Sequence, residues 1–262
     1  MTTDECKHFK ELEVGSRSSG LFHIRFKRRW NRRTIYELMR ALDLATGDSA
    51  VQLVVLSGEF SAGCESEPLA LRQGREKRMR QMPSGQQEAV TSNDPEEQYI
   101  HEKAANFVMR SLAKKLLAHR SLLVAFVQTE CVGLGLSVCS LCDLVFATES
   151  AAFVPSLDHM DPCIQVGPGW LVPHLNWLLR LGDRADVGAA LSCGLLVSLE
   201  GDDPQQEFWH RIEEYARLPI SASLLATQRG MLRPWREALL NELRAESTPL
   251  AAQQRRLARN KL

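Results

Sequence analysis

The 262-residue chain carries 32 Lys and Arg residues against 32 Asp and Glu residues, so its formal net charge is zero. This balance argues against a protein built to wrap nucleic acid, whose surface is strongly basic. Hydrophobic residues make up 44% of the chain, enough for a substantial core, but no apolar run is long enough to cross a membrane. The seven cysteines are an odd number without a secretory signal, which favours a reducing compartment over a disulfide framework.

The first part of the chain predicts a β-hairpin, a helix and a buried strand. Apolar residues alternate with polar ones at 12–14 and 22–26, and Gly15, three serines and Gly20 lie between them, which indicates a hairpin with one buried face. A basic turn follows at residues 27–33. Helical spacing of apolar residues over 34–45 predicts an amphipathic helix that ends at Gly47. The run 51–56 is almost wholly apolar, which is typical of a strand buried on both faces.

The pattern breaks at residues 65–100, where charged runs surround a Pro-Ser-Gly turn, and we expect a long mobile surface segment there. A helix is predicted near residues 104–116, a buried strand at 122–127, a glycine-led helix at 133–141 and a strand at 144–147. Alternating buried strands and amphipathic helices predict an α/β fold with parallel strand pairing. Beyond residue 203 the pattern is helical, with apolar stripes formed by Phe208, Ile212 and Tyr215 and by Trp235, Leu239 and Leu243.

Two glycine-bearing turns are the candidate functional positions. Ser61-Ala62-Gly63-Cys64 follows the predicted strand 51–56, and Gly133-Leu134-Gly135 opens the predicted helix 133–141. Glycine has no Cβ, so backbone can approach a ligand closely at such turns, and a helix start leaves its first amides free. Two such donors aimed at one point would make an oxyanion hole. Taken singly, such a glycine turn is more often a plain tight turn than a ligand site.

The order of these parts resembles the crotonase (enoyl-CoA hydratase/isomerase) superfamily over roughly residues 8–245. The hairpin, the basic turn with Asn31, the helix and the two glycine turns are followed by Leu141-Cys142-Asp143-Leu144 and by the pattern that ends at Phe153. The stretch 134–153 is the most specific. The helix at residues 38–42 and the end of the chain are most similar to the peroxisomal 3,2-enoyl-CoA isomerases.

The resemblance implies a particular architecture and assembly. Residues 1–200 would form a crotonase-like core, a spiral of ββα units that contains the mobile insertion at 65–100. Residues 201–262 would form a C-terminal helical trimerisation region. The protein would then be a homotrimer or a hexamer, with no membrane span and no nucleic-acid partner.

The resemblance also implies a site for a CoA thioester. The backbone N–H groups of Cys64 and Leu134 correspond to the two donors that hold the thioester carbonyl. Enolisation places negative charge on that oxygen, which two fixed donors stabilise. Arg29, together with arginines 28, 32 and 33, becomes a candidate for the CoA phosphates, with a solvated basic turn as the alternative. Coenzyme A enters only as part of the substrate, and we expect no separate cofactor and no metal. The substrate pocket would be framed by Ala62, Gly63, Gly133 and Gly135.

The carboxylates that serve as bases in this superfamily are missing from their expected positions. Hydratases carry one Glu where this chain has Ser137 and a second where it has Leu157. Peroxisomal isomerases use a Glu at the position of Ile164 or Gln165, and a glutamine accepts no proton at neutral pH. Asp158 is the nearest replacement, although it is one residue further along and a methylene shorter, and an ordinary loop residue is the alternative.

Two functions therefore remain open from the sequence. The first is a divergent 3,2-trans-enoyl-CoA isomerase of fatty-acid β-oxidation, in which Asp158 would shuttle the proton. The second is a catalytically inactive crotonase-fold binding or scaffold protein. The missing carboxylates favour the second function, whereas the two glycine turns and the end of the chain favour an acyl-CoA setting. We therefore expect the divergent isomerase first, with the inactive protein as the alternative.

The end of the chain predicts a location. It reads Asn260-Lys261-Leu262, which matches two of the three residues of the C-terminal Ser-Lys-Leu peroxisomal signal. We therefore expect the peroxisome first and the cytosol next, with the peroxisomal import receptor as a partner of this tail.

Overall fold

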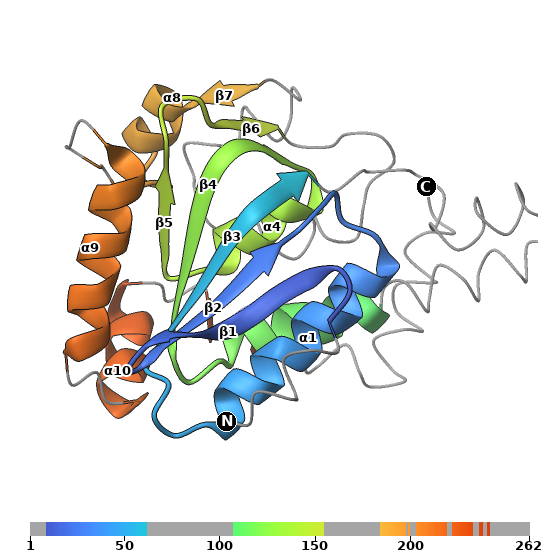
Figure 1. The fold of residues 1–262 in the computed structure, drawn as a ribbon, viewed down its shortest axis with the longest axis vertical. Helices are drawn as coiled ribbons and strands as arrows, with labels where there is room; N and C mark the ends of the chain where they lie inside the picture. Colours follow the sequence, from blue (N-terminus) through green and yellow to red (C-terminus); the bar gives the residue numbers. More distant parts are fainter. Residues whose placement is uncertain are drawn as a thin grey trace, which may run out of the picture.

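The computed structural model describes residues 9–61, 107–154, 184–197, 199, 203–218, 222–232, 236–237 and 240–241. Within these residues the strands are β1 (Leu12–Ser18), β2 (Leu21–Phe26), β3 (Leu53–Ser61), β4 (Leu122–Val132), β5 (Leu144–Ala147), β6 (Ala152–Val154) and β7 (Ala185–Asp186). They form one sheet in the order β1-β2-β3-β4-β6-β7, with β5 also paired to β4. Helices pack against both faces of this sheet (Figure 1). The predicted α/β fold is confirmed.

The hairpin and the parallel strands appear where the sequence predicted them. β1 and β2 are antiparallel, and Gly20 turns the chain between them at a φ of 80°, a conformation that favours glycine. β2, β3 and β4 then run parallel to one another. β3 is buried on both faces, because Val54 and Leu56 belong to one core cluster while Leu53 and Val55 belong to the other.

The larger core lies between the sheet and helices α1 (Arg32–Gly47), α4 (Leu134–Leu141) and the helical residues 107–117. α1 begins two residues before the predicted start because Asn31 caps it: the Asn31 carboxamide oxygen accepts hydrogen bonds from the Arg33 and Thr34 amides. The Thr34 hydroxyl accepts in return from the Asn31 amide, which completes a capping box. The predicted helices 34–45 and 133–141 are thus confirmed with slightly different ends.

The smaller core lies on the opposite face, under α9 (Pro204–Arg217). Phe208 of α9 stacks on Phe126 of β4, with ring centroids 4.0 Å apart and planes 6° from parallel. Phe208 and Ile212 are fully buried against the sheet of their own chain, while Tyr215 is only half-buried. The first predicted apolar stripe therefore contributes to the fold of this chain.

The second half of the described chain completes the sheet edge. β5 pairs with the first half of β4 and β6 with its end, so the sheet divides next to the turn at Gly133. β7 pairs antiparallel with β6 and leads into α8 (Val187–Ser192), and α10 (Ala222–Leu232) follows α9. No helix among the described residues is long and apolar enough to cross a membrane. The predicted segment 65–100 and the second stripe of Trp235, Leu239 and Leu243 lie outside the described residues.

A buried carboxylate ties the C-terminal helices to the core. Asp143, which precedes β5, is bonded by the guanidinium groups of both Arg229 and Arg236. Its carboxylate also accepts the Leu123 amide of β4 at 2.8 Å, and Arg236 donates to the Leu141 carbonyl at 3.0 Å. Burial acts to raise the pKa of Asp143, but the two arginines outweigh it and hold that pKa below its ordinary value of 3.8. The carboxylate is therefore ionised at neutral pH and joins three parts of the chain.

We expect Asp143→Asn to destabilise the protein by about 3–5 kcal/mol at pH 7, because it leaves two buried guanidinium groups without their counter-charge. The exposed Asp43, which pairs with Lys115, supplies the matched control, and Asp43→Asn should cost about 1 kcal/mol or less. Urea unfolding measures both variants. Because the pKa of Asp143 is lowered by folding, its contribution should be complete above pH 4 and lost as pH falls further. Equal losses in the two variants would contradict this account.

Candidate functional site

The basic turn, the end of β3 and the start of α4 meet at one edge of the sheet. Ser61, the last residue of β3, is paired with Val132, the last residue of β4. The Trp30 amide donates to the Ser61 carbonyl at 3.2 Å, and the Trp30 indole donates to the Glu59 carbonyl at 2.6 Å. This edge is formed by the carboxyl ends of parallel strands, where ligands bind in open α/β sheets. The two predicted glycine turns therefore begin side by side.

Gly133 makes the turn from β4 into α4. Its φ is 58° and its ψ is −115°, a conformation that residues with a side chain rarely adopt. The Gly133 amide donates to the Val154 carbonyl of β6 at 3.0 Å, so the turn is held from the neighbouring strand. Leu134 is then the first residue of α4, and its amide has no hydrogen-bond partner among the described residues. A free amide at a helix start can stabilise negative charge, as the sequence predicted for Leu134.

Gly135 is required by the fold itself. A Cβ built on Gly135 would lie 1.9 Å from the Phe60 carbonyl oxygen of β3, closer than any side chain can approach. The first turn of α4 therefore lies directly against the backbone of β3. Gly135 was predicted as part of the substrate pocket. In the structure the space that a side chain would need at Gly135 is occupied by the Phe60 backbone.

Ser137, which the resemblance predicts to stand where hydratases carry a Glu, lies on α4 beside a small apolar cavity. Its hydroxyl lies 3.5 Å from the Gly133 carbonyl, and its side chain is buried. Ser137 and Leu134 face a cavity of about 20 Å³ between α4 and the helical residues 107–117. A serine hydroxyl carries no charge at neutral pH and cannot replace a carboxylate base. The apolar walls of the cavity are Met109, Leu112, Ala113, Leu116, Val138 and Leu141.

The basic turn contains four arginines that differ in their partners. Arg28 forms an ion pair with Glu11 at 3.0 Å, and Arg33 with Glu37 at 2.8 Å. The Arg32 guanidinium lies over the Tyr36 ring, 5.7 Å from its centroid. Arg29 is exposed and has no ion pair among the described residues. Arg29 and Arg32 are thus the arginines of this turn that no described carboxylate pairs with, and Arg32 is additionally held against Tyr36.

The ion pair between Arg33 and Glu37 is part of the structure that joins β1 to α1. The Glu37 carboxylate accepts the backbone amides of Lys10, Glu11 and Leu12, which fixes the start of β1 to α1. Burial acts to raise the pKa of Glu37, but the hydrogen bonds from Arg33 and from these amides lower it below its ordinary value. Arg33 therefore stabilises a carboxylate inside the chain.

Several predicted site residues lie outside the described residues: Ala62, Gly63, Cys64 and Asp158, together with Leu157, Ile164 and Gln165. The second amide donor and the candidate base therefore remain predictions. Within the described part of the chain, no group of three or more His, Cys, Asp or Glu side chains could hold a metal ion.

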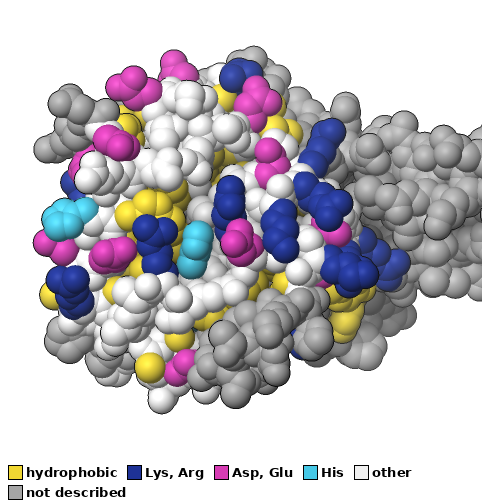
Figure 2. Space-filling model, in the orientation of Figure 1, with side chains coloured by type: hydrophobic (Ala, Val, Ile, Leu, Met, Phe, Trp, Pro, Cys, Tyr) yellow, Lys and Arg dark blue, Asp and Glu magenta, His cyan; other side chains and the backbone are white. Residues whose placement is uncertain are grey.

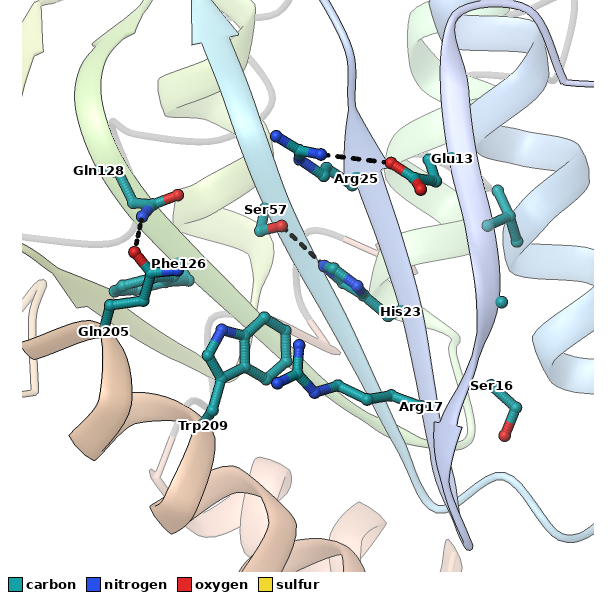
Figure 3. A pocket seen from close by; sticks show the side chains of 12 residues that line it. Glu13, Ser16, Arg17, His23, Arg25, Ser57, Phe126, Gln128, Gln205 and Trp209 are labelled. Carbon is teal, nitrogen blue, oxygen red and sulfur yellow. Dashed lines mark hydrogen bonds and ion pairs between the residues drawn. The ribbon is translucent and has the colours of Figure 1, made fainter.

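Sequence reasoning did not single out a second cavity, which lies on the α9 face of the sheet (Figure 3). Its volume is about 560 Å³. The His23 ring and the Ser57 hydroxyl are joined at 2.7 Å on its floor, and Trp209 of α9 forms one wall. The available signal was the alternation in β2, which places His23 and Arg25 on the face opposite Ile24, but the sequence does not show that α9 leaves this area open.

Comparison with known proteins gives a consistent picture, although the chain matches no protein-family model. It is 24% identical over 255 residues to enoyl-CoA delta isomerase 2 of Homo sapiens, a match that covers 91% of this chain. The chain spans 58% of the length of that relative. The solved structure of an enoyl-CoA hydratase from Bacillus halodurans has a TM-score of 0.64 at 14% identity, covering 90% of this chain and 92% of that one.

Two further solved structures agree. An enoyl-CoA hydratase/carnithine racemase from Magnetospirillum magneticum has a TM-score of 0.64 at 18% identity, covering 97% of this chain and 94% of that one. An enoyl-CoA hydratase/isomerase from Marinobacter aquaeolei has a TM-score of 0.62 at 14% identity, covering 96% and 97%. The predicted crotonase fold and the resemblance to enoyl-CoA hydratases and isomerases are confirmed.

We expect Gly135→Ala to destabilise the protein by about 1–3 kcal/mol, because the added methyl group must push α4 away from the Phe60 carbonyl. Gly230→Ala in α10 is the matched control, since nothing lies within 4 Å of the Cβ that it adds. That change should stabilise the protein by up to about 1 kcal/mol, as alanine favours a helix over glycine. Thermal unfolding compares the two. A neutral Gly135→Ala would show that α4 is free to move on β3.

Proposed function

We propose that this crotonase-fold protein binds an acyl-CoA thioester and is a divergent 3,2-trans-enoyl-CoA isomerase. The observation that carries the proposal is the Leu134 amide, which has no described partner and opens α4 at the carboxyl ends of β3 and β4. Moving a double bond from position 3 to position 2 requires removal of a proton next to the thioester carbonyl. The resulting enolate oxygen gains charge, and a fixed amide donor stabilises that charge by about 3 kcal/mol.

The second donor of the proposed oxyanion hole is the Cys64 amide. Ser61 ends β3 beside Val132, and the chain continues through Ala62 and Gly63 to Cys64. The glycine turn that begins at Ser61 therefore starts on the strand next to the one that leads into the turn at Gly133. This adjacency supports the pairing of Cys64 with Leu134 around one carbonyl oxygen.

The side chains beside Leu134 are apolar, which suits an acyl group in chemical character, although the cavity of about 20 Å³ there has room for only about one water molecule. It is walled by α4 and the helical residues 107–117, and Ser137 is smaller than the Glu that hydratases carry at this position. Arg29 lies on the basic turn that reaches the same edge of the sheet, and its free charge suits a CoA phosphate. Coenzyme A enters as part of the substrate in this proposal, and the chemistry needs no further cofactor or metal.

The catalytic base is the element of the proposed active site for which the sequence has no carboxylate at the positions used in this superfamily. Ser137 cannot abstract a proton, so we assign that role to Asp158, with Gln165 marking the position of the isomerase Glu. The buried, apolar setting of Ser137 also favours a second candidate function, a catalytically inactive acyl-CoA-binding or scaffold protein. An isomerase and an inactive acyl-CoA-binding protein share the oxyanion turn and differ only in the proton transfer, whereas a scaffold protein needs neither.

Assembly and location complete the proposal. We further propose a homotrimer or hexamer formed through the C-terminal helices, as the resemblance in the sequence implies. The terminal Asn260-Lys261-Leu262 resembles the peroxisomal Ser-Lys-Leu signal and supports import through its receptor. In the peroxisome the protein would act in the β-oxidation of unsaturated acyl chains.

Calorimetric titration with dodecanoyl-CoA tests binding. The wild-type protein should bind it, and Arg29→Gln should raise Kd by about tenfold through loss of one charge-assisted contact with a phosphate. Arg40→Gln is the matched control. Arg40 is exposed like Arg29 but belongs to α1, where it lies over the Phe9 ring, so this variant should leave Kd unchanged. Absence of binding by the wild-type protein would overturn the isomerase and the inactive acyl-CoA-binding protein, and would leave the scaffold protein.

A double-bond shift assay with 3-dodecenoyl-CoA then separates the two functions. If Asp158 is the base, Asp158→Asn should lower kcat by about 10²–10⁴-fold while Kd stays the same. Gln165→Glu should raise kcat, because it places a carboxylate where the isomerase branch carries one. A wild-type protein that binds the thioester without shifting its double bond would identify the inactive binding protein.

A further inference from the structure

The α9 face of the sheet changes character along the strands. Near their amino ends Leu21, Val55 and Val124 pack under α9, but further along the same strands the outward positions become polar. Basic and acidic side chains lie together over this part of the sheet, next to a hydrophobic patch toward α9 (Figure 2). The cavity of about 560 Å³ lies at this transition, and its volume is typical of small-molecule pockets.

Two arginines face the cavity from the hairpin (Figure 3). Arg25 contacts Glu13 through one nitrogen at 3.3 Å, and Arg17 contacts Glu213 through one nitrogen at 3.4 Å. The Arg25 and Glu13 side chains are 60% and 63% exposed, so this pair is weak in water. A guanidinium group has five N–H donors, so each arginine can bind a ligand in addition to, or in place of, its carboxylate.

The cavity walls are held in position by ring contacts. The Arg17 guanidinium lies over the Trp209 ring, 3.8 Å from its centroid. Trp209 meets the His23 ring edge-on, with centroids 4.9 Å apart, and His23 is joined to the buried Ser57 hydroxyl at 2.7 Å. Donors that are already fixed lose little conformational entropy when a ligand binds.

The charged and neutral groups that line the cavity can be assigned individually. Burial, together with the charges of Arg17 and Arg25, lowers the pKa of His23 to about 4, and the opposing effect of Glu13 is smaller. His23 is therefore neutral at pH 7 and offers hydrogen bonding without charge. On the opposite wall Gln128 and Gln205 are joined to each other at 3.1 Å and present neutral amides. A ligand in this cavity thus meets two cations, one carboxylate and several neutral polar groups.

We propose that this cavity is a second ligand site, which binds a small molecule carrying a carboxylate or phosphate group between the Arg25 and Arg17 guanidinium groups. Planar guanidinium groups bind both anions through paired N–H donors, while the Ser57, Gln128 and Gln205 side chains contact the uncharged part of the ligand. The site lies on the face of the sheet opposite α4, so it is separate from the proposed thioester site.

Nuclear magnetic resonance of the full chain at pH 7 tests the site. The probes are inorganic phosphate and succinate, each titrated at constant ionic strength against sodium chloride. The indole N–H signal of Trp209, assigned with Trp209→Phe, should shift saturably with at least one probe. The probe that binds more tightly identifies whether the site prefers phosphate or carboxylate.

Variants separate this pocket from general surface charge. Arg25→Gln should weaken binding of the preferred probe by about tenfold, because it removes one charge-assisted pair of hydrogen bonds. Arg40→Gln removes the same charge from the other face and should leave binding unchanged. Arg25 is largely exposed, so its variant should keep the native fold. The proposal is overturned if neither probe shifts the Trp209 signal more than sodium chloride does. It is also overturned if Arg25→Gln and Arg40→Gln bind the preferred probe with the same affinity.

Discussion

The close contact between α4 and β3 is the constraint on which the candidate site depends. Because the Gly135 backbone lies against the Phe60 carbonyl, the first turn of α4 cannot move relative to the end of β3. Gly133 makes that approach possible by turning the chain at a φ of 58°, and the Val154 carbonyl holds the Gly133 amide. The Leu134 amide is thereby fixed next to β3, the strand that leads into the glycine turn at residues 61–64. A donor fixed before the reaction costs no reorganisation when charge develops.

The same strands serve the two faces of the sheet differently. On one face β2, β3 and β4 pack under α1, α4 and the helical residues 107–117, and their carboxyl ends present the proposed thioester site. On the other face α9 covers the amino halves of the strands, and the polar outward residues beyond it form the anion pocket. Asp143 and its two arginines hold the C-terminal helices against this arrangement. The protein can therefore carry two binding sites on one rigid sheet.

The sequence predicted the regular elements well because their signal is local. The alternation at 22–26, the apolar run 51–56 and the helical spacing at 34–45 each correspond to an observed element. The ends of β3 and β4 were predicted too short, because both strands continue through polar residues such as Ser57 and Gln128. A polar residue in a strand gives no periodic signal when it faces a solvent-filled pocket.

The contacts that the sequence could not predict are those between distant residues. Asp143 was noted only as part of a motif, since its partners Arg229 and Arg236 are 86 and 93 residues away along the chain. Likewise, four arginines of the basic turn read alike in sequence, and only the structure shows that Arg28 and Arg33 are paired with acids while Arg29 is not. The assignment of Ser137 to the position of a hydratase Glu rests on the order of motifs alone and stays a prediction, while the structure places Ser137 on α4.

Infrared spectroscopy of a bound acyl-CoA with a ¹³C-labelled thioester carbonyl tests the central claim most directly. Donors at Leu134 and Cys64 should polarise the carbonyl, so its stretching frequency in the complex should fall below the value for the same thioester in water. This shift requires no catalysis, so it applies to an isomerase and to an inactive binding protein alike. A thioester shown by calorimetry to be bound, with an unshifted carbonyl frequency, would contradict an oxyanion hole at the start of α4.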